Sequence, residues 1–320
     1  MVMAQSLFMI LKADNPQCQI DVIAPEWSFS LLDRMPEVTQ GIAIPLGHGK
    51  FGLNRRIKLG KSLRDLHYDQ AILLPNSWKS ALVPFYANIA VRTGYIGEYR
   101  WGLLNDARKL DKSSLTMTVQ RFVALGLPKH ECFPDTYPIP KLAIEETKQV
   151  SVAKKFNLKI TDKILALCPG AEYGPAKRWP AEYYAEIAKK KIQQGWQVCL
   201  FGSEKDTAVA KEINQAAEDL CTDFTGRTTM AEAVDLMSLV NMVVTNDSGL
   251  MHVAAALDKN IIAIYGSSDP GFTPPLNSTA KILTLNLTCS PCFKRECPLG
   301  HLKCLKDIPP SLVLASMEQL

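Results

Sequence analysis

Apolar and polar positions along the chain follow two repeating patterns: short apolar runs rich in β-branched residues, and longer segments with helical spacing. This alternation is typical of parallel sheets covered by helices. In the first half, strands are expected at 20–24, 41–45, 70–75 and 91–95, and helices at 54–66, 77–87 and 117–125. In the second half, strands are expected at 163–168, 196–201, 242–246, 261–266 and 281–286. Helices there are expected from Pro180, from Glu204, near Met230, from Asp247 and after Pro310.

The first twelve residues, MVMAQSLFMILK, are apolar but lack a basic region and a small-residue cleavage site. Their spacing predicts an amphipathic core helix rather than a signal peptide, with Ala4, Leu7, Phe8 and Leu11 on one face. No apolar run approaches the roughly 20 residues of a membrane-spanning helix. We therefore expect a cytoplasmic protein whose nine cysteines are mostly reduced.

Prolines at 128, 134, 138 and 140 are too dense for a helix or an inner strand, so we predict a linker with a domain boundary near residue 140. The expected fold is α/β, with two Rossmann-like doubly wound domains, 1–140 and 141–320, facing a cleft. The first element is a helix, whereas such a domain normally starts with its central strand. We therefore expect the first strand of the N-terminal domain to be missing from this chain.

Composition excludes several classes of protein. The chain has 320 residues, 47% of them hydrophobic, and a net charge of +4 from 36 basic and 32 acidic residues. It is neither disordered, collagen-like nor a polytopic membrane protein, and its charge is too small to indicate nucleic-acid binding. Basic residues nevertheless gather in one segment: Lys50, Arg55, Arg56, Lys58, Lys61 and Arg64. That cluster fits a polyanionic partner, and equally a solvated helix face.

The segment 242–257, MVVTNDSGLMHVAAAL, carries the strongest chemical signal. A buried strand ends in a turn where Asp247 or Ser248 can cap the following helix, leaving backbone N–H groups for an anion such as a pyrophosphate. Gly249 allows a phosphate to approach the backbone, and His252 can donate to a phosphate oxygen. The alternative is a capped helix with a core-facing histidine.

Two other loops follow strands. The segment 167–180 carries Lys177 and Arg178, and cations placed above strand ends can neutralise a leaving diphosphate without a metal. The segment 199–206 enters a tight turn before Glu204 and can place a polar side chain near a nucleoside. A solvated loop in the first case and a purely structural turn in the second remain open.

Four cysteines lie close together near the C-terminus, at 289, 292, 297 and 304, with His301 among them. A Cys-x-x-Cys pair followed by two more cysteines resembles a zinc knuckle, although the spacings match no standard finger. A structural metal and a reduced cluster that stabilises a loop both remain open, and we assign neither a catalytic metal nor a cofactor.

Taken together, these stretches resemble the ADP-heptose:lipopolysaccharide heptosyltransferases, within glycosyltransferase family 9, and particularly the type II group. The resemblance covers essentially the whole chain and rests on PLGHGKFGLNRRIKLGKSLR, LPNSWKSALVPF, GLLNDARKLDK, CPGAEYGPAKRWP, VTNDSGLMHVAAAL, FTPPL and CSPCFKREC. It implies a GT-B fold and an inverting, metal-independent transfer of heptose from ADP-heptose to the first heptose of the lipopolysaccharide inner core. It further implies work at the cytoplasmic face of the inner membrane, with peripheral contact to that surface and no nucleic-acid partner.

The resemblance also assigns residues. Lys177 matches the lysine that steadies the departing diphosphate. Asp247, Ser248, Gly249 and His252 match the donor-binding loop and helix start, and Glu204 a neighbouring donor position. The region that holds acceptor phosphates in related enzymes corresponds to Arg55, Arg56, Lys61 and Arg64.

One part of the family pattern is not found. Family members begin with a strand and a Gly-Asp loop whose aspartate is taken as the general base, and the present chain starts after that point. Asp21 and Asp69 stand at strand edges and are poor substitutes. The alternatives are therefore a non-catalytic nucleotide-sugar-binding fragment, or a related transferase that uses another sugar nucleotide.

Overall fold

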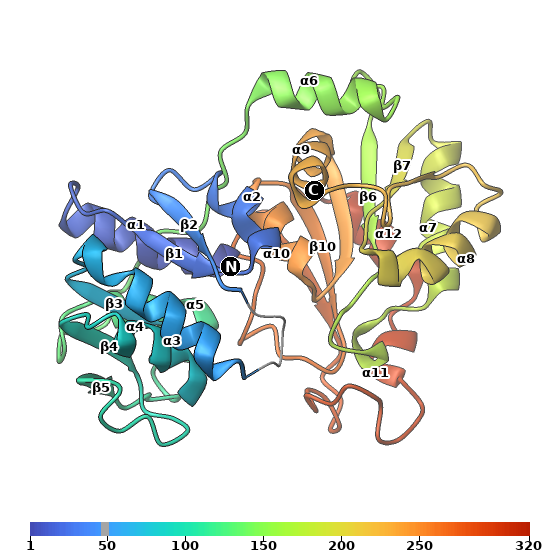
Figure 1. The fold of residues 1–320 in the computed structure, drawn as a ribbon. Coiled ribbons are helices and arrows are strands. Elements are labelled where there is room, and N and C mark those ends of the chain that lie inside the picture. Colours follow the sequence, from blue (N-terminus) through green and yellow to red (C-terminus); the bar gives the residue numbers. More distant parts are fainter. Residues whose placement is uncertain (46–50) are drawn as a thin grey trace. The chain divides into compact units, whose positions relative to one another are not determined.

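The computed structural model describes residues 1–45 and 51–320 of the chain, so Lys50 of the basic segment lies outside the described residues. The backbone divides into two compact units, Met3–Pro138 and Ile139–Leu320. Each unit has its own parallel strands and its own helices (Figure 1).

The predicted amphipathic helix is present as α1 (Gln5–Asp14) of unit 1, preceded by a short 3-10 turn (Val2–Ala4). The side chains of Leu7 and Phe8 are buried, and α1 packs against α5 (Thr118–Gly126). A Cβ at Gly126 would lie 2.4 Å from a methyl carbon of Leu7. Glycine at this position therefore lets the two helices approach closely.

The strands of unit 1 are all parallel and form two separate ladders, β1–β2 and β3–β4–β5. The pattern predicted four of them but not β5, a three-residue strand without an apolar run. The strands are β1 (Asp21–Ala24), β2 (Gln40–Ala43), β3 (Gln70–Leu73), β4 (Val91–Tyr95) and β5 (Asp106–Arg108). The remaining helical segments are Glu26–Ser28, α2 (Phe29–Leu32), α3 (Leu53–Ser62), Arg64–Leu66, Trp78–Ala81 and α4 (Leu82–Tyr86).

Unit 2 is built on one six-stranded parallel sheet in the order β11–β10–β9–β6–β7–β8. The strands are β6 (Ile164–Cys168), β7 (Gln197–Leu200), β8 (Thr222–Asp223), β9 (Met242–Asn246), β10 (Asn260–Tyr265) and β11 (Lys281–Thr284). In chain order this is the 3-2-1-4-5-6 arrangement of a Rossmann fold. The strand order reverses between β6 and β9, which are hydrogen-bonded neighbours.

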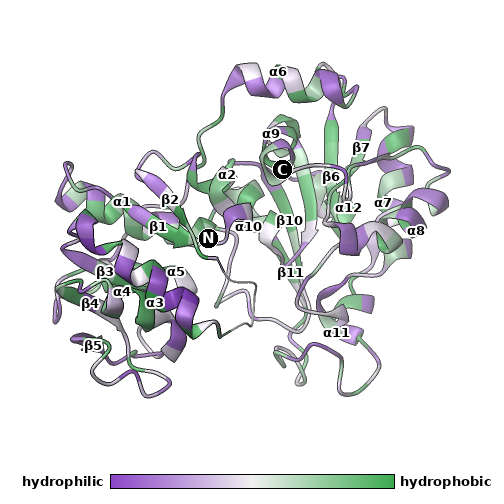
Figure 2. Cartoon of the chain, viewed as in Figure 1, coloured by the Kyte–Doolittle hydropathy of each residue, from purple (hydrophilic) through white to green (hydrophobic). Residues whose placement is uncertain are grey.

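Helices cover this sheet so completely that β6 and β9 have no exposed residue. Successive side chains point to opposite faces: Leu165 and Leu167 belong to one core cluster, and Ile164, Ala166 and Cys168 to the other. Figure 2 shows much of the central strands in green, the colour of hydrophobic residues. The helical segments are α6 (Glu146–Lys155), Pro175–Lys177, α7 (Ala181–Gln193), Glu204–Asp206, α8 (Thr207–Ala216), α9 (Met230–Leu239), α10 (Gly249–Ala256), α11 (Lys303–Lys306) and α12 (Pro310–Met317).

One buried amide holds the reversal point together. Asn246, the last residue of β9, is fully buried. Its Nδ2 donates to the Pro169 carbonyl after β6 at 2.7 Å. Its Oδ1 accepts from the Trp179 backbone N–H and from the Tyr184 hydroxyl, both at 3.1 Å. The ends of β6 and β9 and the start of α7 are thereby fixed to one another.

We predict that Asn246→Ala lowers the free energy of unfolding by about 3 kcal/mol, because it leaves the buried Pro169 carbonyl and Trp179 N–H without a partner. The Tyr184 hydroxyl would keep only its 3.4 Å contact with the Cys168 carbonyl. Chemical denaturation measures the loss. The control is Asn54→Ala, at an exposed position of α3, which should change stability by no more than about 0.5 kcal/mol. Equal stability of the two variants would contradict the assigned role of Asn246.

Candidate functional site

The chemical groups of unit 2 gather where the parallel strands end. The loops after β6, β7 and β9 leave the same edge of the sheet, because these strands are parallel neighbours. In open α/β sheets, ligands bind outside the carboxyl ends of the strands, at the point where the strand order reverses. Here that point lies between the loop carrying Lys177 and the turn at Asp247.

Lys177 and Asp247, seventy residues apart in sequence, form an ion pair. Lys177 Nζ donates to Asp247 Oδ2 at 2.5 Å, and the two side chains are 17% and 6% exposed. The ring of Tyr173 lies under the ammonium, with its centroid 5.1 Å from Nζ. Tyr173 stands out in no sequence pattern, so its contact with Lys177 could be found only in the structure. The fold therefore places one largely buried cation at the start of α10.

The first turn of α10 carries no side-chain cap, contrary to the sequence expectation. Ser248 occupies the N-cap position, but its side chain makes no capping hydrogen bond and lies 3.4 Å from the Thr245 hydroxyl. The Asp247 carboxylate is directed to Lys177 instead. A Cβ added to Gly249 would have no atom within 4 Å. Backbone N–H groups at a helix start with open space beside them suit an anionic ligand.

His252 lies one turn into α10 and is partly buried. Burial lowers its pKa to about 4, and the nearby Lys177 ammonium lowers it further while Asp247 acts in the opposite direction. The imidazole is therefore neutral at pH 7. A neutral imidazole offers one N–H donor and one acceptor nitrogen.

Glu204 lies at the carboxyl end of β7, the strand next to β6, and its side chain is exposed. The backbone of Gly226, whose φ is +66°, approaches Glu204 closely, and a Cβ at this position would lie 3.0 Å from the Glu204 Cα. Ser203 and Asp206 fix the turn through hydrogen bonds of 2.9 and 2.8 Å. In the Rossmann arrangement an acidic side chain after the second strand is placed to bind ribose hydroxyls.

Among the basic residues predicted to bind the acceptor, Arg56 differs from the others because it is buried. Arg56 is 6% exposed, and its guanidinium donates to the carbonyls of Phe51 and Lys79. Burial lowers its pKa. Arg56 is thus committed to holding α3 in place and is not a surface cation.

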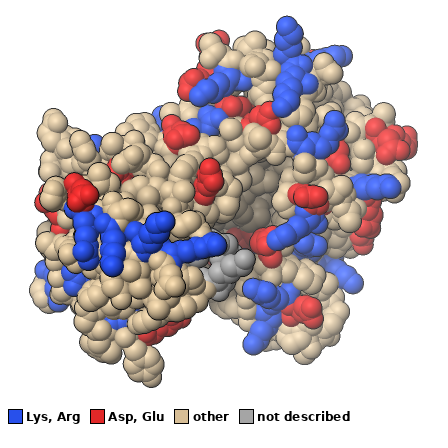
Figure 3. Space-filling view, viewed as in Figure 1, with Lys and Arg blue, Asp and Glu red and all other residues tan. Residues whose placement is uncertain are grey.

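The other basic residues of this segment are exposed. Arg55 donates to the Pro45 carbonyl and Arg64 to the Tyr86 carbonyl, while Lys58 and Lys61 lie on the outer side of α3. Figure 3 shows blue side chains gathered over this part of unit 1. No ion pair joins these four cations to an acidic side chain among the residues described. Their charge is therefore available to a polyanion.

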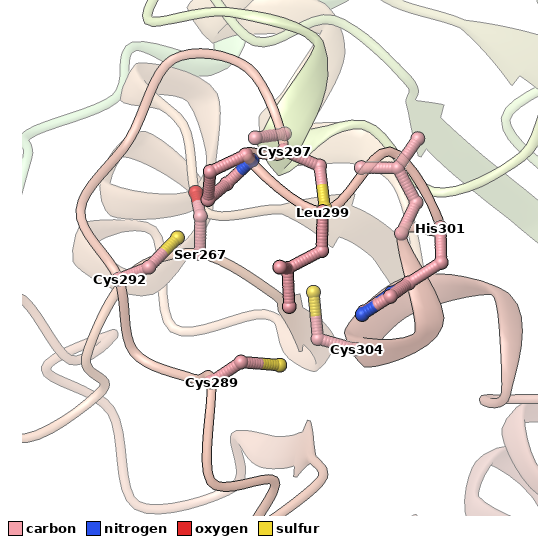
Figure 4. Close-up of a pocket in the computed structure, with 10 residues that line it drawn as sticks. Ser267, Cys289, Cys292, Cys297, Leu299, His301 and Cys304 are labelled. Carbon is pink, nitrogen blue, oxygen red and sulfur yellow. The ribbon is translucent and has the colours of Figure 1, made fainter.

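The four C-terminal cysteines line one small cavity with Ser267, Ala176 and His301 (Figure 4). All four are free thiols. Burial raises the pKa of Cys304, as do the neighbouring cysteines, whereas backbone N–H groups, that of Leu302 foremost, lower the pKa of Cys297. In the conformation described, no three His, Cys, Asp or Glu side chains of residues 1–45 and 51–320 are arranged to hold a metal ion.

Comparison with known proteins gives concordant matches. The model of glycosyltransferase family 9 (heptosyltransferase) matches residues 56–303. The chain is 46% identical over its full length to lipopolysaccharide heptosyltransferase 2 of Salmonella typhimurium, of which it covers 94%. It is also 46% identical over its full length to lipooligosaccharide heptosyltransferase 2 of Haemophilus influenzae, of which it covers 95%.

Solved structures agree. The structure of Escherichia coli ADP-heptose lipopolysaccharide heptosyltransferase II matches the whole chain with a TM-score of 0.90 at 43% identity, and 94% of that chain is covered. A family 9 glycosyl transferase from Veillonella parvula matches 99% of the chain with a TM-score of 0.87, covering 92% of that protein, and at 20% identity supports the fold alone. The expected α/β fold with Rossmann-like, GT-B-type halves is confirmed.

No helix among the described residues combines the length and the apolar character that crossing a bilayer requires.

We predict that Gly249→Ala weakens binding of a diphosphate such as ADP by about tenfold while leaving the fold intact. The added methyl would enter the space beside the first-turn N–H groups, where it meets no protein atom, and Gly249 does not need a positive φ. Isothermal titration calorimetry gives the dissociation constant, and the melting temperature of the same variant serves as the control. Unchanged ADP affinity would place the anion elsewhere.

Proposed function

Because the chain belongs to glycosyltransferase family 9, the heptosyltransferases, we propose that it is an inverting transferase that moves a heptose from ADP-heptose to the first heptose of the lipopolysaccharide inner core. The observation that carries the proposal is the convergence of Lys177, Asp247 and the uncapped start of α10 at the strand-reversal point of unit 2. The full-length likeness to heptosyltransferase 2 proteins supports this choice of donor and acceptor.

Unit 2 is the nucleotide-sugar domain in this proposal. The diphosphate of the donor lies against the first-turn N–H groups of α10, with Gly249 allowing its approach and His252 donating one hydrogen bond. Ser248 contributes at the N-cap, and Glu204 binds the ribose hydroxyls from the end of β7. Nucleotide binding at the switch point of this sheet follows the general behaviour of Rossmann folds.

In the reaction, a hydroxyl oxygen of the acceptor heptose forms a bond to the anomeric carbon of the donor. The bond from that carbon to the diphosphate oxygen breaks, and ADP leaves with the electron pair. The ammonium of Lys177 and the N–H groups of α10 stabilise the negative charge that develops on the departing diphosphate. Because Lys177 is already held by Asp247, little reorganisation is needed at that moment.

The hydroxyl proton must pass to a base, and we assign none. Asp21 is the first residue of β1, and Asp69 directly precedes β3. Both therefore lie at the amino ends of parallel strands, away from the edge where ligands bind. Asp21 is in addition engaged by the Tyr68 hydroxyl and by the Gln40 amide.

Unit 1 is the acceptor-binding domain. Arg55, Lys61 and Arg64 offer exposed charge for phosphates and carboxylates of the inner core, while Arg56 supports α3 beneath them. The acceptor is anchored in the inner membrane, so the enzyme works at the cytoplasmic face of that membrane, with its basic surface in peripheral contact with anionic lipid.

We predict that Lys177→Met lowers kcat with ADP-heptose and a mono-heptosylated core acceptor by about 10²- to 10³-fold, because the main countercharge to the leaving diphosphate is lost. Product formation followed by mass spectrometry measures the rate. Competition with UDP-sugars tests which nucleotide the donor carries, and we expect that they do not displace ADP-heptose. Absence of transfer by the wild-type protein that nevertheless binds ADP would overturn the assigned reaction but not the nucleotide site.

Two control variants separate charge from structure. Lys177→Met leaves the Asp247 carboxylate buried and unpaired, which is itself destabilising. The double variant Lys177→Met/Asp247→Asn removes both charges and should recover stability without recovering kcat. Lys189→Met, at a half-exposed lysine of α7, should behave like the wild type. Recovery of kcat in the double variant would show that Lys177 only neutralises Asp247.

For the acceptor side, we predict that Lys61→Glu and Arg64→Glu each raise the acceptor KM about tenfold and leave the donor KM unchanged. Arg56→Glu should instead lower stability, since it would bury an unpaired charge. Lys148→Glu, at an exposed position of unit 2, is the matched control. A rise in donor KM with an unchanged acceptor KM would reject this assignment.

A further inference from the structure

Four thiols surround one cavity that the proposed reaction does not use. Cys289, Cys292, Cys297 and Cys304 line a space of about 20 Å³ together with Ser267. A cavity of this size accommodates one water molecule or one ion. Four of the ten residues that line it are cysteines, and sulfur is a poor hydrogen-bond partner for water but a strong ligand of soft metals.

The cavity wall contains a polar group without a partner. Ser267 is 1% exposed, and its hydroxyl has no hydrogen-bond partner among the described residues. A buried hydroxyl left unpaired costs about 1–3 kcal/mol. A metal-bound thiolate is a charged acceptor and therefore a stronger one than the sulfur of a neutral thiol. Thiolates in this cavity would give the Ser267 hydroxyl the partner that it lacks.

The loop after Cys297 turns sharply. Gly300 and Leu302 adopt left-handed conformations, with φ of +69° and +53°, and the Gly300 N–H donates to the Cys297 carbonyl at 3.1 Å. The turn leads the chain from Cys297 to Cys304, and both cysteines line the same cavity.

His301 is less suited than the cysteines to bind a metal. Its Nδ1 accepts a hydrogen bond from the Lys303 backbone N–H at 3.0 Å. In a neutral imidazole the other nitrogen then carries the proton, so neither nitrogen has a free lone pair. The sulfurs are left as the ligand set.

We propose that Cys289, Cys292, Cys297 and Cys304 together bind one tetrahedral metal ion as thiolates. Four-sulfur sites select zinc or iron. The sulfurs surround the cavity without three of them meeting at one point in the conformation described, so their side chains turn inward when the ion binds. Each cysteine bound as a thiolate releases its proton to solvent.

The ion has a structural role, because the cysteine segment buttresses the loop that carries Lys177. The Arg295 carbonyl accepts from the Ala176 N–H at 3.0 Å, and the Phe293 carbonyl accepts from the Tyr173 hydroxyl at 2.7 Å. At Gly174, φ is +152° and a Cβ would lie 2.5 Å from the Arg295 oxygen. Fixing the segment 289–304 therefore fixes the loop of Lys177.

The test begins with elemental analysis of the full chain, purified under reducing conditions without chelator. We expect one zinc or one iron per chain, and the measured element decides between them. After removal of the metal, titration with Co²⁺ should give thiolate-to-cobalt charge-transfer and tetrahedral d–d absorption that saturates at one equivalent. A wild-type protein without metal that also takes up neither Zn²⁺ nor Co²⁺ at one equivalent would overturn the proposal.

Variants then test the ligand set. Cys292→Ser and Cys304→Ser should lose the bound metal, whereas Cys132→Ser, an exposed cysteine outside the cluster, should retain it. His301→Gln should retain the metal and the cobalt spectrum, and a changed spectrum would overturn the four-sulfur assignment. Full metal occupancy in Cys292→Ser would also overturn the four-sulfur assignment. The wild-type cobalt titration tests the proposal even where a serine variant fails to fold.

The coupling to the nucleotide site has its own readout, which rests on the proposed function. Removing the metal should weaken ADP binding by about tenfold, because the loop that carries Lys177 loses its support, and Zn²⁺ should restore it. Metal content and cobalt spectra do not depend on ADP. Failure of ADP to bind therefore counts against the proposed function, whereas absence of a bound metal counts against the four-thiolate metal site.

Discussion

The candidate site depends on one constraint: the loop between β6 and α7 and the end of β9, which are far apart in the chain, must meet at one point, and a single buried amide holds them there. Asn246 terminates a strand with no exposed residue and bonds the segment after β6 and the first turn of α7. Because it is fully buried, its hydrogen bonds are not exchanged with water. The position of Lys177 against α10 follows, since its loop begins at Pro169 and ends at Trp179.

The ion pair between Lys177 and Asp247 is better understood as a positioning device than as a source of stability. Removing two charges from water costs about as much as their attraction returns, so a buried pair contributes little net stability. What the pair provides is an ammonium group fixed at the positive end of a helix, where it would otherwise be repelled. The Tyr173 ring beneath it adds a favourable cation–π contact.

Glycines and carbonyls at this edge show how closely the backbone is packed around the site. Gly170 faces the Asp206 carboxylate, which a Cβ would approach to 2.5 Å, and Gly174 faces the Arg295 carbonyl at the same distance. Side chains at these positions would push apart the loops after β6 and β7 and the cysteine segment. The same close packing transmits order from the segment 289–304 to Lys177, because the Ala176 N–H donates to the Arg295 carbonyl and the Tyr173 hydroxyl to the Phe293 carbonyl.

The sequence alone was enough to predict the two alternating α/β halves, most strands and the loops that carry Lys177 and Asp247. A strand that is buried on both faces consists of an uninterrupted run of apolar residues, and such a run is visible in the sequence. It missed β5 and β8, which are too short to produce such a run, and α6, whose polar face dominates its pattern. Only the tertiary structure revealed that Arg56 is buried, that Ser248 leaves its helix uncapped and that Asn246 and Tyr173 support the site. Each of these depends on contacts between residues far apart in the chain, and local periodicity carries no information about them.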